Sequence, residues 1–463
     1  MKEPLKQPSR DTLTTVNRDG SRYFLHPADT RGLFTMLRRL SGWGLIALYV
    51  ALPWIPVNGH PALFLDVARR QFHIFGLTLV PQDMWLAFFI VTGLGFFLFY
   101  VTSLFGRVWC GWTCPQTVFL EHVFRRVERL IDGDALAQRK LEQAPWTPGK
   151  VIRRAVKHGL FVLLALLVAH IALSYFVSLS GLYAAMQQAP WQNAGLFVLV
   201  FTLAGALYFN FAWFREQFCI ILCPYGRFQS VLIDDHSLVI GYDEKRGEPR
   251  GKEDGSGDCV DCLRCVQVCP TGIDIRQGLQ MECIGCSNCV DACHEVMQRL
   301  GRPGRLIRYD SLNGLNGRPT RWFRPRTIIY TVLLLAGATA MTLSFSTFRT
   351  LDIGITRLQG APYYLGEGQV RNQYLLRLIN KSAQTRRFHL HLSSPQSALQ
   401  APGFPDTVEV AAESEVMQPL VLLMPEAGFP GAFDFKVEVQ ADEGGAGVAR
   451  QAEFLGPDPQ TSP

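Results

Sequence analysis

The sequence has few charged residues and lacks the motifs of nucleotide-dependent enzymes. Only 18% of its 463 residues are charged, whereas 48% are hydrophobic and 31 are Phe. This balance is typical of a chain with long apolar segments and argues against a purely soluble enzyme. No G-x-G-x-x-G follows an expected strand and no phosphate-binding loop occurs, so we expect no nucleotide or flavin site.

Two further absences narrow the class of protein. No basic run with interleaved aromatic residues occurs and the net charge is only +6, so we expect no nucleic-acid partner. The N-terminal residues are polar and lack the apolar core of a cleavable signal peptide. We therefore expect residues 1–37 to form a cytoplasmic tail.

Cysteine is absent from residues 350–463, and every one of the twelve cysteines belongs to a short repeated spacing. Structural disulfides would be expected in an exported region of a protein. Cysteines grouped elsewhere instead predict metal ligands or redox groups in a reducing compartment.

Five apolar stretches approach the length that crosses a bilayer. They are residues 38–57, 84–106, 159–180, 193–213 and 327–346. The first is the weakest, because Pro53 and Pro56 interrupt it. The pattern predicts a multi-pass α-helical membrane domain over residues 38–240 and a separate fifth span at 327–346.

The distribution of Lys and Arg predicts which segments face the cytoplasm. Basic residues gather before the first stretch and in residues 107–158 and 214–326, but they are absent from 181–192. Between the first two stretches only Arg69 and Arg70 are basic. We therefore expect a bacterial inner-membrane protein with its N-terminus inside and residues 350–463 in the periplasm.

The C-terminal segment changes to a period of two. Residues 374–378, 388–392 and 433–439 alternate apolar and polar side chains and are separated by turn residues. This alternation predicts an all-β, immunoglobulin-like sandwich over residues 350–463.

Eight cysteines form two consecutive runs with C-x2-C-x2-C-x3-C spacing. They are Cys259, Cys262, Cys265 and Cys269, followed by Pro270, and Cys283, Cys286, Cys289 and Cys293, followed by His294. The doubled run resembles the bacterial ferredoxin signature and predicts two 4Fe-4S clusters in an inserted α+β domain over residues 241–310. Structural zinc is the alternative, because C-x2-C pairs also form four-cysteine zinc sites.

The ferredoxin resemblance also implies a ligand set for each cluster. In two-cluster ferredoxins the fourth cysteine of each run binds the other cluster. By that resemblance one cluster is held by Cys259, Cys262, Cys265 and Cys293, and the other by Cys283, Cys286, Cys289 and Cys269.

The remaining cysteines form two C-x3-C-P pairs, Cys110 with Cys114 and Cys219 with Cys223. Each pair follows an apolar stretch and leads into an amphipathic basic segment, so the two halves form an internal repeat. If the halves pack about a pseudo-twofold axis, four thiols meet at the inner face of the membrane. Such thiols can bind Cu(I) or cycle between dithiol and disulfide. The alternative is that these small residues only fill space beside Phe side chains.

The histidines give weaker indications. His170 lies within an apolar stretch and the other stretches contain no His, so we expect a hydrogen-bonded core residue rather than a haem ligand. His60 and His73 are expected to be solvated. His389 and His391 alternate on one strand, where a metal site is a minor alternative.

The joint pattern resembles the CcoG family of cytochrome c oxidase accessory proteins, also called FixG or RdxA. This family is similar to a wider group of membrane polyferredoxins that includes the quinol-oxidising nitrate-reductase maturation proteins. The stretches that carry the resemblance are residues 109–115, 218–225 and 259–297, and it extends over nearly the whole chain.

The resemblance implies a role in assembly of a cbb3-type oxidase, with reduction of Cu(II) to Cu(I). By this resemblance the protein is an oxidoreductase with two 4Fe-4S clusters as cofactors. Its catalytic, copper-binding residues are Cys110, Cys114, Cys219 and Cys223. The implied partners are the lipid bilayer, oxidase subunits or copper-delivery proteins, and an unidentified electron donor. Homo-oligomers are a further expectation. The charge pattern places both cysteine groups on the cytoplasmic side, which favours reduction of cytoplasmic copper.

Two other functions fit the same residues. One is a quinol-linked electron carrier, although no polar quinone site is evident in the spans. The other is an assembly scaffold in which the clusters serve only as structure or as a sensor. Reoxidation of the reduced protein by copper would separate the copper-reductase hypothesis from both.

Overall fold

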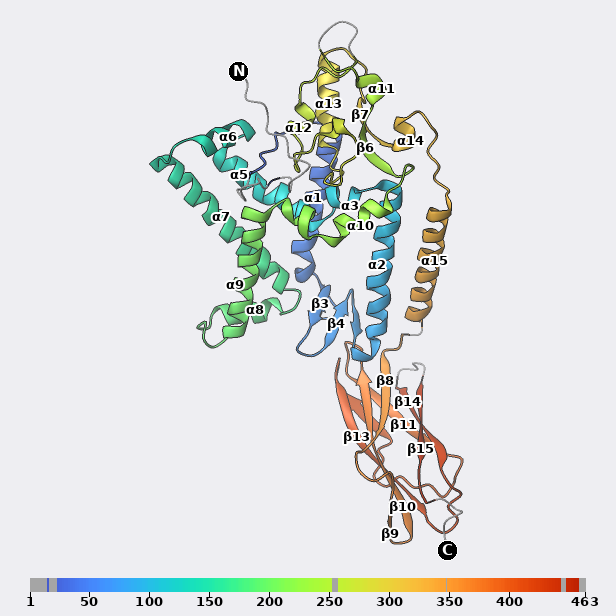
Figure 1. The fold of residues 1–463 in the computed structure, drawn as a ribbon. Coiled ribbons are helices and arrows are strands. Elements are labelled where there is room, and N and C mark those ends of the chain that lie inside the picture. Colours follow the sequence, from blue (N-terminus) through green and yellow to red (C-terminus); the bar gives the residue numbers. More distant parts are fainter. Residues whose placement is uncertain (1–14, 16–22, 252–256, 347, 443–446, 458–463) are drawn as a thin grey trace. The chain divides into compact units, whose positions relative to one another are not determined.

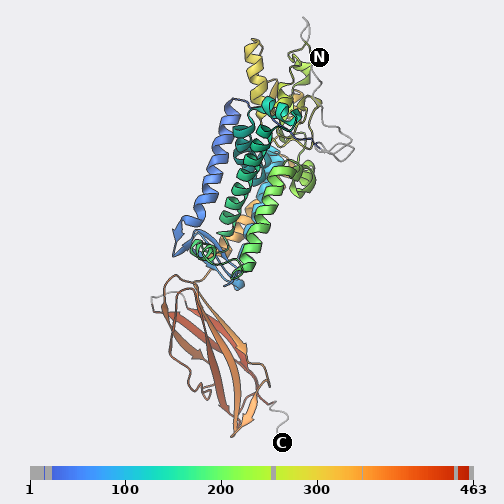
Figure 2. The same cartoon turned by 90° about the vertical axis from the view of Figure 1, so that its left-hand side faces the viewer.

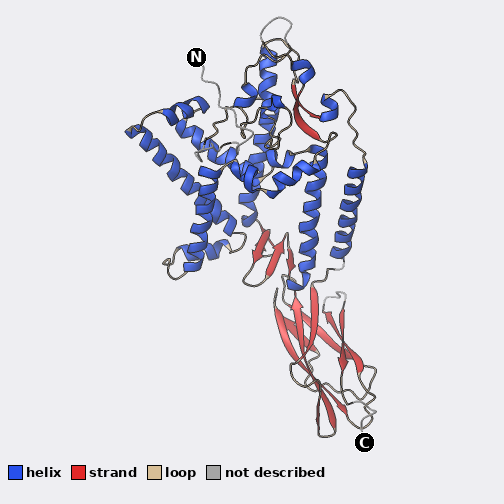
Figure 3. Ribbon diagram, in the orientation of Figure 1, coloured by secondary structure: helices blue, strands red, loops and turns tan. Residues whose placement is uncertain are grey.

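The computed structural model describes residues 15, 23–251, 257–346, 348–442 and 447–457. Much of the expected N-terminal tail, residues 1–14 and 16–22, lies outside the described residues. The chain forms two compact units, one of residues 1–55 and 87–341 and the other of residues 56–86 and 342–463 (Figure 1). The first unit is mainly helical and the second is built mainly of strands (Figure 3).

Four helices in the described part of the chain are long and apolar enough to cross a membrane. They are Pro81–Phe105, Pro148–Leu173, Ala194–Phe214 and Pro325–Ser346. These helices contain α2 (Met84–Phe105), α7 (Pro148–Leu173), α9 (Ala194–Phe209) with the π-helical turn η4 (Asn210–Phe214), and α15 (Pro325–Ser346). Helices α7 and α9 lie side by side (Figure 2). The structure thus bears out four apolar helices in a multi-domain membrane protein.

The first of the five expected spans is a helix but does not join these four. It corresponds to α1 (Leu33–Ala51), which carries Arg38 and Arg39, and to the 3-10 turn η1 (Leu52–Trp54). Pro53 in that turn removes a backbone donor and ends the helix. The two arginines and the end of the helix before Pro53 explain why this segment is less apolar than the four long helices.

The third expected span is shifted. We expected residues 159–180, whereas α7 begins at Pro148 and ends at Leu173, before α8 (Leu179–Met186). Its start is set by Thr147, whose side chain accepts a hydrogen bond from the Lys150 N–H. His170 Nδ1 lies 2.7 Å from the Leu166 carbonyl oxygen, so it is hydrogen-bonded as expected.

Short helices connect the long ones at one end of the first unit. They are α3 (Val108–Trp112), α4 (Pro115–Phe119), η3 (Leu120–Phe124), α5 (Arg125–Asp132), α6 (Ala135–Gln143), η5 (Phe218–Leu222) and α10 (Pro224–Leu232). Leu120 and Phe124 of η3 form an apolar core with Phe161 of α7 and Phe211 of η4. The Phe124 ring stacks on Phe211 and meets Phe161 edge to face, which joins the two halves of the repeat.

The two cysteine runs lie in an α+β segment framed by one pair of strands. Strand β6 (Leu238–Tyr242) pairs antiparallel with β7 (Ile307–Ser311). Between and after them lie α11 (Glu244–Gly247), α12 (Arg264–Gln267), η6 (Ile275–Gln277), α13 (Asn288–Arg299) and α14 (Leu312–Leu315). The core of this domain, which we call the cluster domain, combines Ile and Leu side chains with Cys259 and Cys265.

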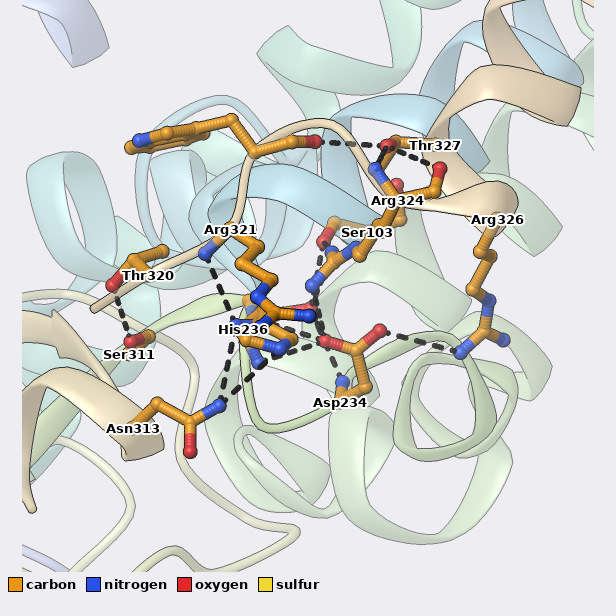
Figure 4. A network of polar contacts seen from close by, with 12 residues as sticks. Ser103, Asp234, His236, Ser311, Asn313, Thr320, Arg321, Arg324, Arg326 and Thr327 are labelled. Atoms are coloured by element: carbon orange, nitrogen blue, oxygen red, sulfur yellow. Dashed lines mark hydrogen bonds and ion pairs between the residues drawn. The ribbon is translucent and has the colours of Figure 1, made fainter. Parts of the chain in front are cut away.

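A polar network ties the cluster domain to the helices α2 and α15 (Figure 4). Arg324, just before α15, pairs with Asp234 and donates to the Ser103 carbonyl oxygen of α2. Ser237 Oγ donates to the same carbonyl at 2.6 Å. Because Arg324 and Ser237 are buried, these bonds fix β6 against the end of α2.

The second unit contains two four-stranded antiparallel sheets. One consists of β8 (Leu351–Arg357), β9 (Tyr364–Gly366), β10 (Gln369–Asn380) and β13 (Glu415–Pro425); the other has the order β12 (Thr407–Val410), β11 (Arg386–Ser393), β14 (Phe433–Ala441) and β15 (Val448–Phe454). Their inward side chains, including Tyr374, Leu376, Phe388 and Phe435, form one buried core. The expected immunoglobulin-like sandwich is confirmed.

Residues 56–86 add a small β-structure to the second unit. It consists of β1 (Pro56–Val57), β2 (His60–Pro61), β3 (Leu63–Asp66), β4 (Gln71–Ile74) and β5 (Leu77–Leu79), with the turn η2 (Pro81–Asp83). Asp83 pairs with the buried Lys381 at 2.8 Å, which joins this segment to the sandwich.

Candidate redox site

The two C-x3-C-P pairs fold in the same way. Cys110 lies on α3 and Cys219 on η5, whereas Cys114 and Cys223 are the N-cap residues of α4 and α10. The backbone N–H of Cys114 donates to the Trp109 carbonyl, and that of Cys223 to the Phe218 carbonyl, both at 2.9 Å. In each case the proline after the second cysteine is the first residue of the new helix, where no N–H is needed.

The structure brings the four thiols of these pairs together. Burial, and then the negative charge of Cys114, raises the pKa of Cys110 to about 12, and Cys223 adds to the effect. Burial also raises the pKa of Cys219, with further contributions from Cys114, Cys110 and Cys223. Thiols whose charges affect one another in this way are neighbours in space.

Gln229 links the two halves at this point. It is fully buried on α10, and its Nε2 lies 3.3 Å from Cys110 Sγ. The bond crosses from the second half of the repeat to the first. It also lowers the pKa of Cys110, although burial outweighs it.

The four thiols are not arranged around one ion. Among the described residues, a single group of three or more ligand atoms lies within 4.8 Å of one another, and it contains none of these cysteines. Each of the four is partly exposed. A soft ion is therefore accessible to the pairs, and some rearrangement would accompany its binding.

The two ferredoxin-type runs also share one backbone geometry. Asp261 and Leu263 have φ values of 53 and 58°, and the matching residues Gly285 and Ser287 have 68 and 60°. The second cysteine of each run thus lies between two left-handed residues. Such a loop turns three cysteines towards one point, while helices α12 and α13 follow immediately.

The fourth cysteine of each run lies with the other run. Burial raises the pKa of Cys293 to about 12, and the charges of Cys262 and Cys259 add to it. In the same way burial raises the pKa of Cys283 to about 11, with Cys269 contributing. The crossed ligand sets implied by the ferredoxin resemblance are compatible with these positions.

The residues around the second set fit a 4Fe-4S group. Cys269, Cys283, Cys286 and Cys289 line one small cavity, whose other walls include four Ile side chains. Burial raises the pKa of Cys283, Cys286 and Cys289, so without a metal these three thiols would stay protonated. Soft thiolate ligands in an apolar pocket suit iron–sulfur chemistry.

The first C-x3-C-P pair touches the second cysteine run directly. A Cβ atom placed on Gly111 would lie 2.7 Å from the Ile284 carbonyl oxygen and 2.9 Å from the Cys286 nitrogen. Trp112 Nε1 donates to the Gly285 carbonyl at 3.3 Å. Only a residue without a side chain fits at position 111, because backbone meets backbone there.

Two arginines hold this contact. Arg38 of α1 is buried, and its Nε donates to the Gly111 carbonyl at 2.7 Å. Arg107 donates to the Cys283 carbonyl at 3.4 Å and to the Gly226 carbonyl at 3.0 Å, which joins the cluster domain to both cysteine pairs.

A buried ion network supports the first run. Arg125 of α5 pairs with Glu121 and Glu216 and donates to the Pro270 carbonyl at 3.2 Å, next to Cys269. Burial would raise the pKa of Glu121, but Arg125 and Arg38 outweigh it and hold the pKa at about 2. Glu121 is therefore a charged partner of Arg125 at neutral pH.

The sequence pattern predicted the cysteines of the site but not the residues that hold their loops together. Arg38, Arg107, Gly111, Trp112 and Gln229 were not singled out. The glycine in Cys110-Gly111-Trp112 was the one available signal, because its counterpart in the second pair is Ile220. Of the histidines, His389 pairs with Asp442 on the surface and does not belong to the group of close ligand atoms.

Comparison with sequence families divides the chain in the same way. A family described as a 4Fe-4S dicluster domain matches residues 214–254 and 250–312. A family described as a 4Fe-4S binding domain matches residues 85–140, and the immunoglobulin-like fold at the C-terminus of FixG matches residues 341–457.

Similar proteins match over most of their length. Protein RdxA of Cereibacter sphaeroides is 35% identical, over 93% of this chain and 97% of that protein. Protein RdxB of the same organism is 34% identical, over 85% and 88%. Nitrogen fixation protein FixG of Rhizobium meliloti is 31% identical, over 86% and 85%.

Proposed function

Because the chain belongs to the FixG/RdxA family of iron–sulfur electron-transport proteins, we propose that it delivers electrons to copper at its C-x3-C-P pairs. The substrate would be Cu(II) on the cytoplasmic side of the inner membrane, and the product Cu(I) for assembly of a cbb3-type oxidase. The observation that carries the proposal is the backbone contact between Gly111 and the loop of Ile284 to Cys286.

The contact matters because it brings two redox groups of one chain together. When bound, the two 4Fe-4S clusters supply single electrons. The loop from Cys283 to Cys286 carries two of the expected cluster ligands, and Gly111 and Trp112 contact this loop. The four thiols offer Cu(I) its preferred soft ligands, which favours the reduced form of the ion. Each Cu(II) takes up one electron, which an external protein or quinol must replace.

Connectivity supports the topology that this function needs. The chain passes between its two units at residues 55/56, 86/87 and 341/342, near the ends of α1, α2 and α15. The N-terminal end of α1 is bound to the cluster domain, because the Thr35 N–H and Oγ each donate to Asp291 at 2.7 Å. If α2 and α15 cross the membrane, α1 must cross it too. We therefore propose five spans, with the cluster domain cytoplasmic and residues 350–463 periplasmic.

The topology is tested with reporter fusions. A reporter joined after Pro463 should be active in the periplasm, and one inserted within 240–251 should be active in the cytoplasm. The reverse result, with the reporter at 240–251 in the periplasm and the one after Pro463 in the cytoplasm, would show that α1 does not cross; both on the same side would show that α15 does not cross.

The redox role is tested by two kinds of cysteine variant. Replacing Cys110 and Cys114 by Ser should leave the iron content unchanged but abolish reduction of Cu(II), because a neutral hydroxyl neither holds Cu(I) nor forms a disulfide. Replacing Cys265 by Ser should lower the iron content and remove the activity with it. Thr113→Ser is the matched control, because it changes the same loop and leaves both thiols.

The two variants must fail differently for the proposal to stand. If the Cys110/Cys114 double variant reduced Cu(II) at the parental rate, the pairs would only fill space. If neither the parent nor any variant lost electrons to Cu(II), a quinol-linked carrier or an assembly scaffold would be the better explanation.

A second candidate for the pairs is that they bind a further cluster. Residues 85–140 match a 4Fe-4S binding family, which favours this candidate. The cysteines of this segment are Cys110 and Cys114. Iron content decides between the two. Anaerobically purified protein should hold about eight iron atoms per chain if copper is the substrate of the pairs, and about twelve if they hold a third cubane.

The physiological partners also belong to this proposal. Oxidase subunits or copper-delivery proteins would receive the copper, and a reduced protein or quinol would supply the electrons. Assembly into homo-oligomers would be compatible with both roles.

A further inference from the structure

Three side chains far apart in the sequence meet in the second unit. His60 of β2, His73 of β4 and Glu413 between β12 and β13 each offer a ligand atom, and these atoms lie within 4.8 Å of one another. In the described part of the chain this is the one such group. We expected His60 and His73 to be solvated, and for His73 that was wrong, because only 3% of it is exposed.

The hydrogen bonds of this group lead from His73 to Glu413. Thr78 Oγ1 donates to Glu413 Oε1 at 2.8 Å and lies 3.0 Å from His73 Nδ1. Because the hydroxyl proton is used towards Glu413, His73 Nδ1 is assigned as the donor to Thr78. Its Nε2 is then an unprotonated nitrogen that is buried and has no hydrogen-bond partner among the described residues.

The carboxylate of Glu413 is held in place from several sides. Its Oε2 contacts His60 Nε2, and its Oε1 lies 3.6 Å from His73 Nδ1. The Glu413 carbonyl accepts from Gln71 Nε2 at 2.9 Å, and its N–H donates to the Ser382 carbonyl at 3.1 Å. Glu413 also has a φ of 49°, in the left-handed region that costs a non-glycine residue free energy. Such strain persists only where the surrounding structure holds the residue in place, and strained residues are concentrated at functional sites.

We propose that His60, His73 and Glu413 bind a divalent transition-metal ion. Two imidazole nitrogens and one carboxylate oxygen suit Cu(II) and Zn(II), whereas Mg(II) and Ca(II) prefer oxygen ligands alone. With equal ligands Cu(II) binds more tightly than Zn(II). Three protein ligands leave a coordination position open for water or for a second donor. The site is separate from the thiol pairs and does not depend on their role.

Binding requires a small movement of His60. The two imidazole rings are stacked, with centroids 3.9 Å apart and planes inclined by 7°. A metal ion lies in the plane of each imidazole that binds it, so parallel stacked rings cannot both address one ion. His60 can turn, because a quarter of its side chain is exposed and β2 has only two residues. The ion then replaces the contact between His60 and Glu413.

The test uses the full-length protein with its clusters. Cys110, Cys114, Cys219 and Cys223 are replaced by Ser so that these thiols do not compete for metal. The protein is titrated with Cu(II), Zn(II) and Mg(II). We expect each chain to bind one equivalent of Cu(II) or Zn(II) and no Mg(II). The bound Cu(II) should give an electron paramagnetic resonance signal that is split by nitrogen.

Three variants assign the binding to this group. His60→Gln and Glu413→Gln should each weaken binding at least about tenfold, because even partners of a metal ligand contribute that much. His389→Gln is the matched control, since His389 also pairs with a carboxylate of the second unit and should leave binding unchanged.

The outcomes that would overturn the proposal are distinct. One is a titration in which the protein binds no equivalent of Cu(II) or Zn(II). Another is tighter binding of Zn(II) than of Cu(II). A third is unchanged affinity in His60→Gln. If Glu413→Gln unfolds the second unit in a thermal melt, the metal affinity of His60→Gln alone tests the proposal, because His60 is partly exposed.

Discussion

Cys114 and Cys223 cap their helices in the same way, but their loops meet different neighbours. The first loop, Cys110-Gly111-Trp112-Thr113-Cys114, packs its backbone on the cysteine run of the cluster domain. The second loop has Ile220 at the position of Gly111, and Arg107 links the helix that follows this loop, at Gly226, to Cys283 of that run. The two copies of the repeat thus share one loop geometry, but the first copy also packs against the cluster domain.

The difference suggests unequal roles for the two pairs. The first pair is next to the ligands of one cluster, and the second is next to the first pair, through Gln229 and Cys110. Electrons from the cluster domain would therefore reach the first pair before the second. Variants that disturb only the first loop should slow reduction of copper more than matched variants in the second.

The largest effect is expected from Gly111→Val. The added side chain would collide with the Ile284 carbonyl and the Cys286 nitrogen, and overpacking of this kind costs about 1–3 kcal/mol. We expect the loops to separate and the rate of Cu(II) reduction to fall at least about tenfold, the change that 1.4 kcal/mol represents. Stopped-flow absorbance of the reduced protein measures the rate, and iron analysis shows whether the clusters remain.

Ile220→Val is the control for this variant, because it removes one methylene at the matching position of the second loop. Its rate should stay close to that of the parent. Equal losses in both variants would mean that the contact of the first loop has no special role.

Arg38→Ala should have the next largest effect. It removes the donor to the Gly111 carbonyl and leaves a buried acceptor unpaired, which costs about 1–3 kcal/mol. We expect a lower midpoint of thermal unfolding and slower reduction of Cu(II). Arg39→Ala should change neither, because 39% of the Arg39 side chain is exposed. A loss of equal size in Arg39→Ala would contradict the assigned role of Arg38.

The smallest effect is expected at Gln229. Its hydrogen bond lowers the pKa of Cys110, which burial raises to about 12. Gln229→Leu should therefore raise this pKa further, reduce the thiolate fraction below pH 12 and slow alkylation of Cys110 by iodoacetamide. Mass spectrometry of the alkylated protein at several pH values measures the rate. Faster alkylation would show that Gln229 shields the thiol instead.

The sequence predicted the elements whose pattern is local. Cysteine spacing, apolar length and alternation are visible within short windows, so the cysteine runs, four apolar helices and the β-sandwich were expected where they occur. The misjudged boundary of α7 has a local cause as well, because its first turns are polar and basic.

Contacts between distant segments could not be read from the sequence. Arg38 reaches Gly111, 73 positions away, and His60 reaches Glu413, 353 positions away. Burial of His73 depends on how residues 56–86 join the sandwich, which no pattern around that histidine indicates. Without such contacts, a histidine in a loop between two spans is simply expected to be exposed.

The most direct test of the central claim is an electron count on the unmodified protein. Protein reduced by one electron per cluster is mixed with excess Cu(II) without oxygen, and Cu(I) is measured with a chelator while cluster absorbance is followed. The proposed function predicts about two Cu(I) per chain, in step with reoxidation of both clusters. Clusters that stay reduced while Cu(II) persists would contradict it.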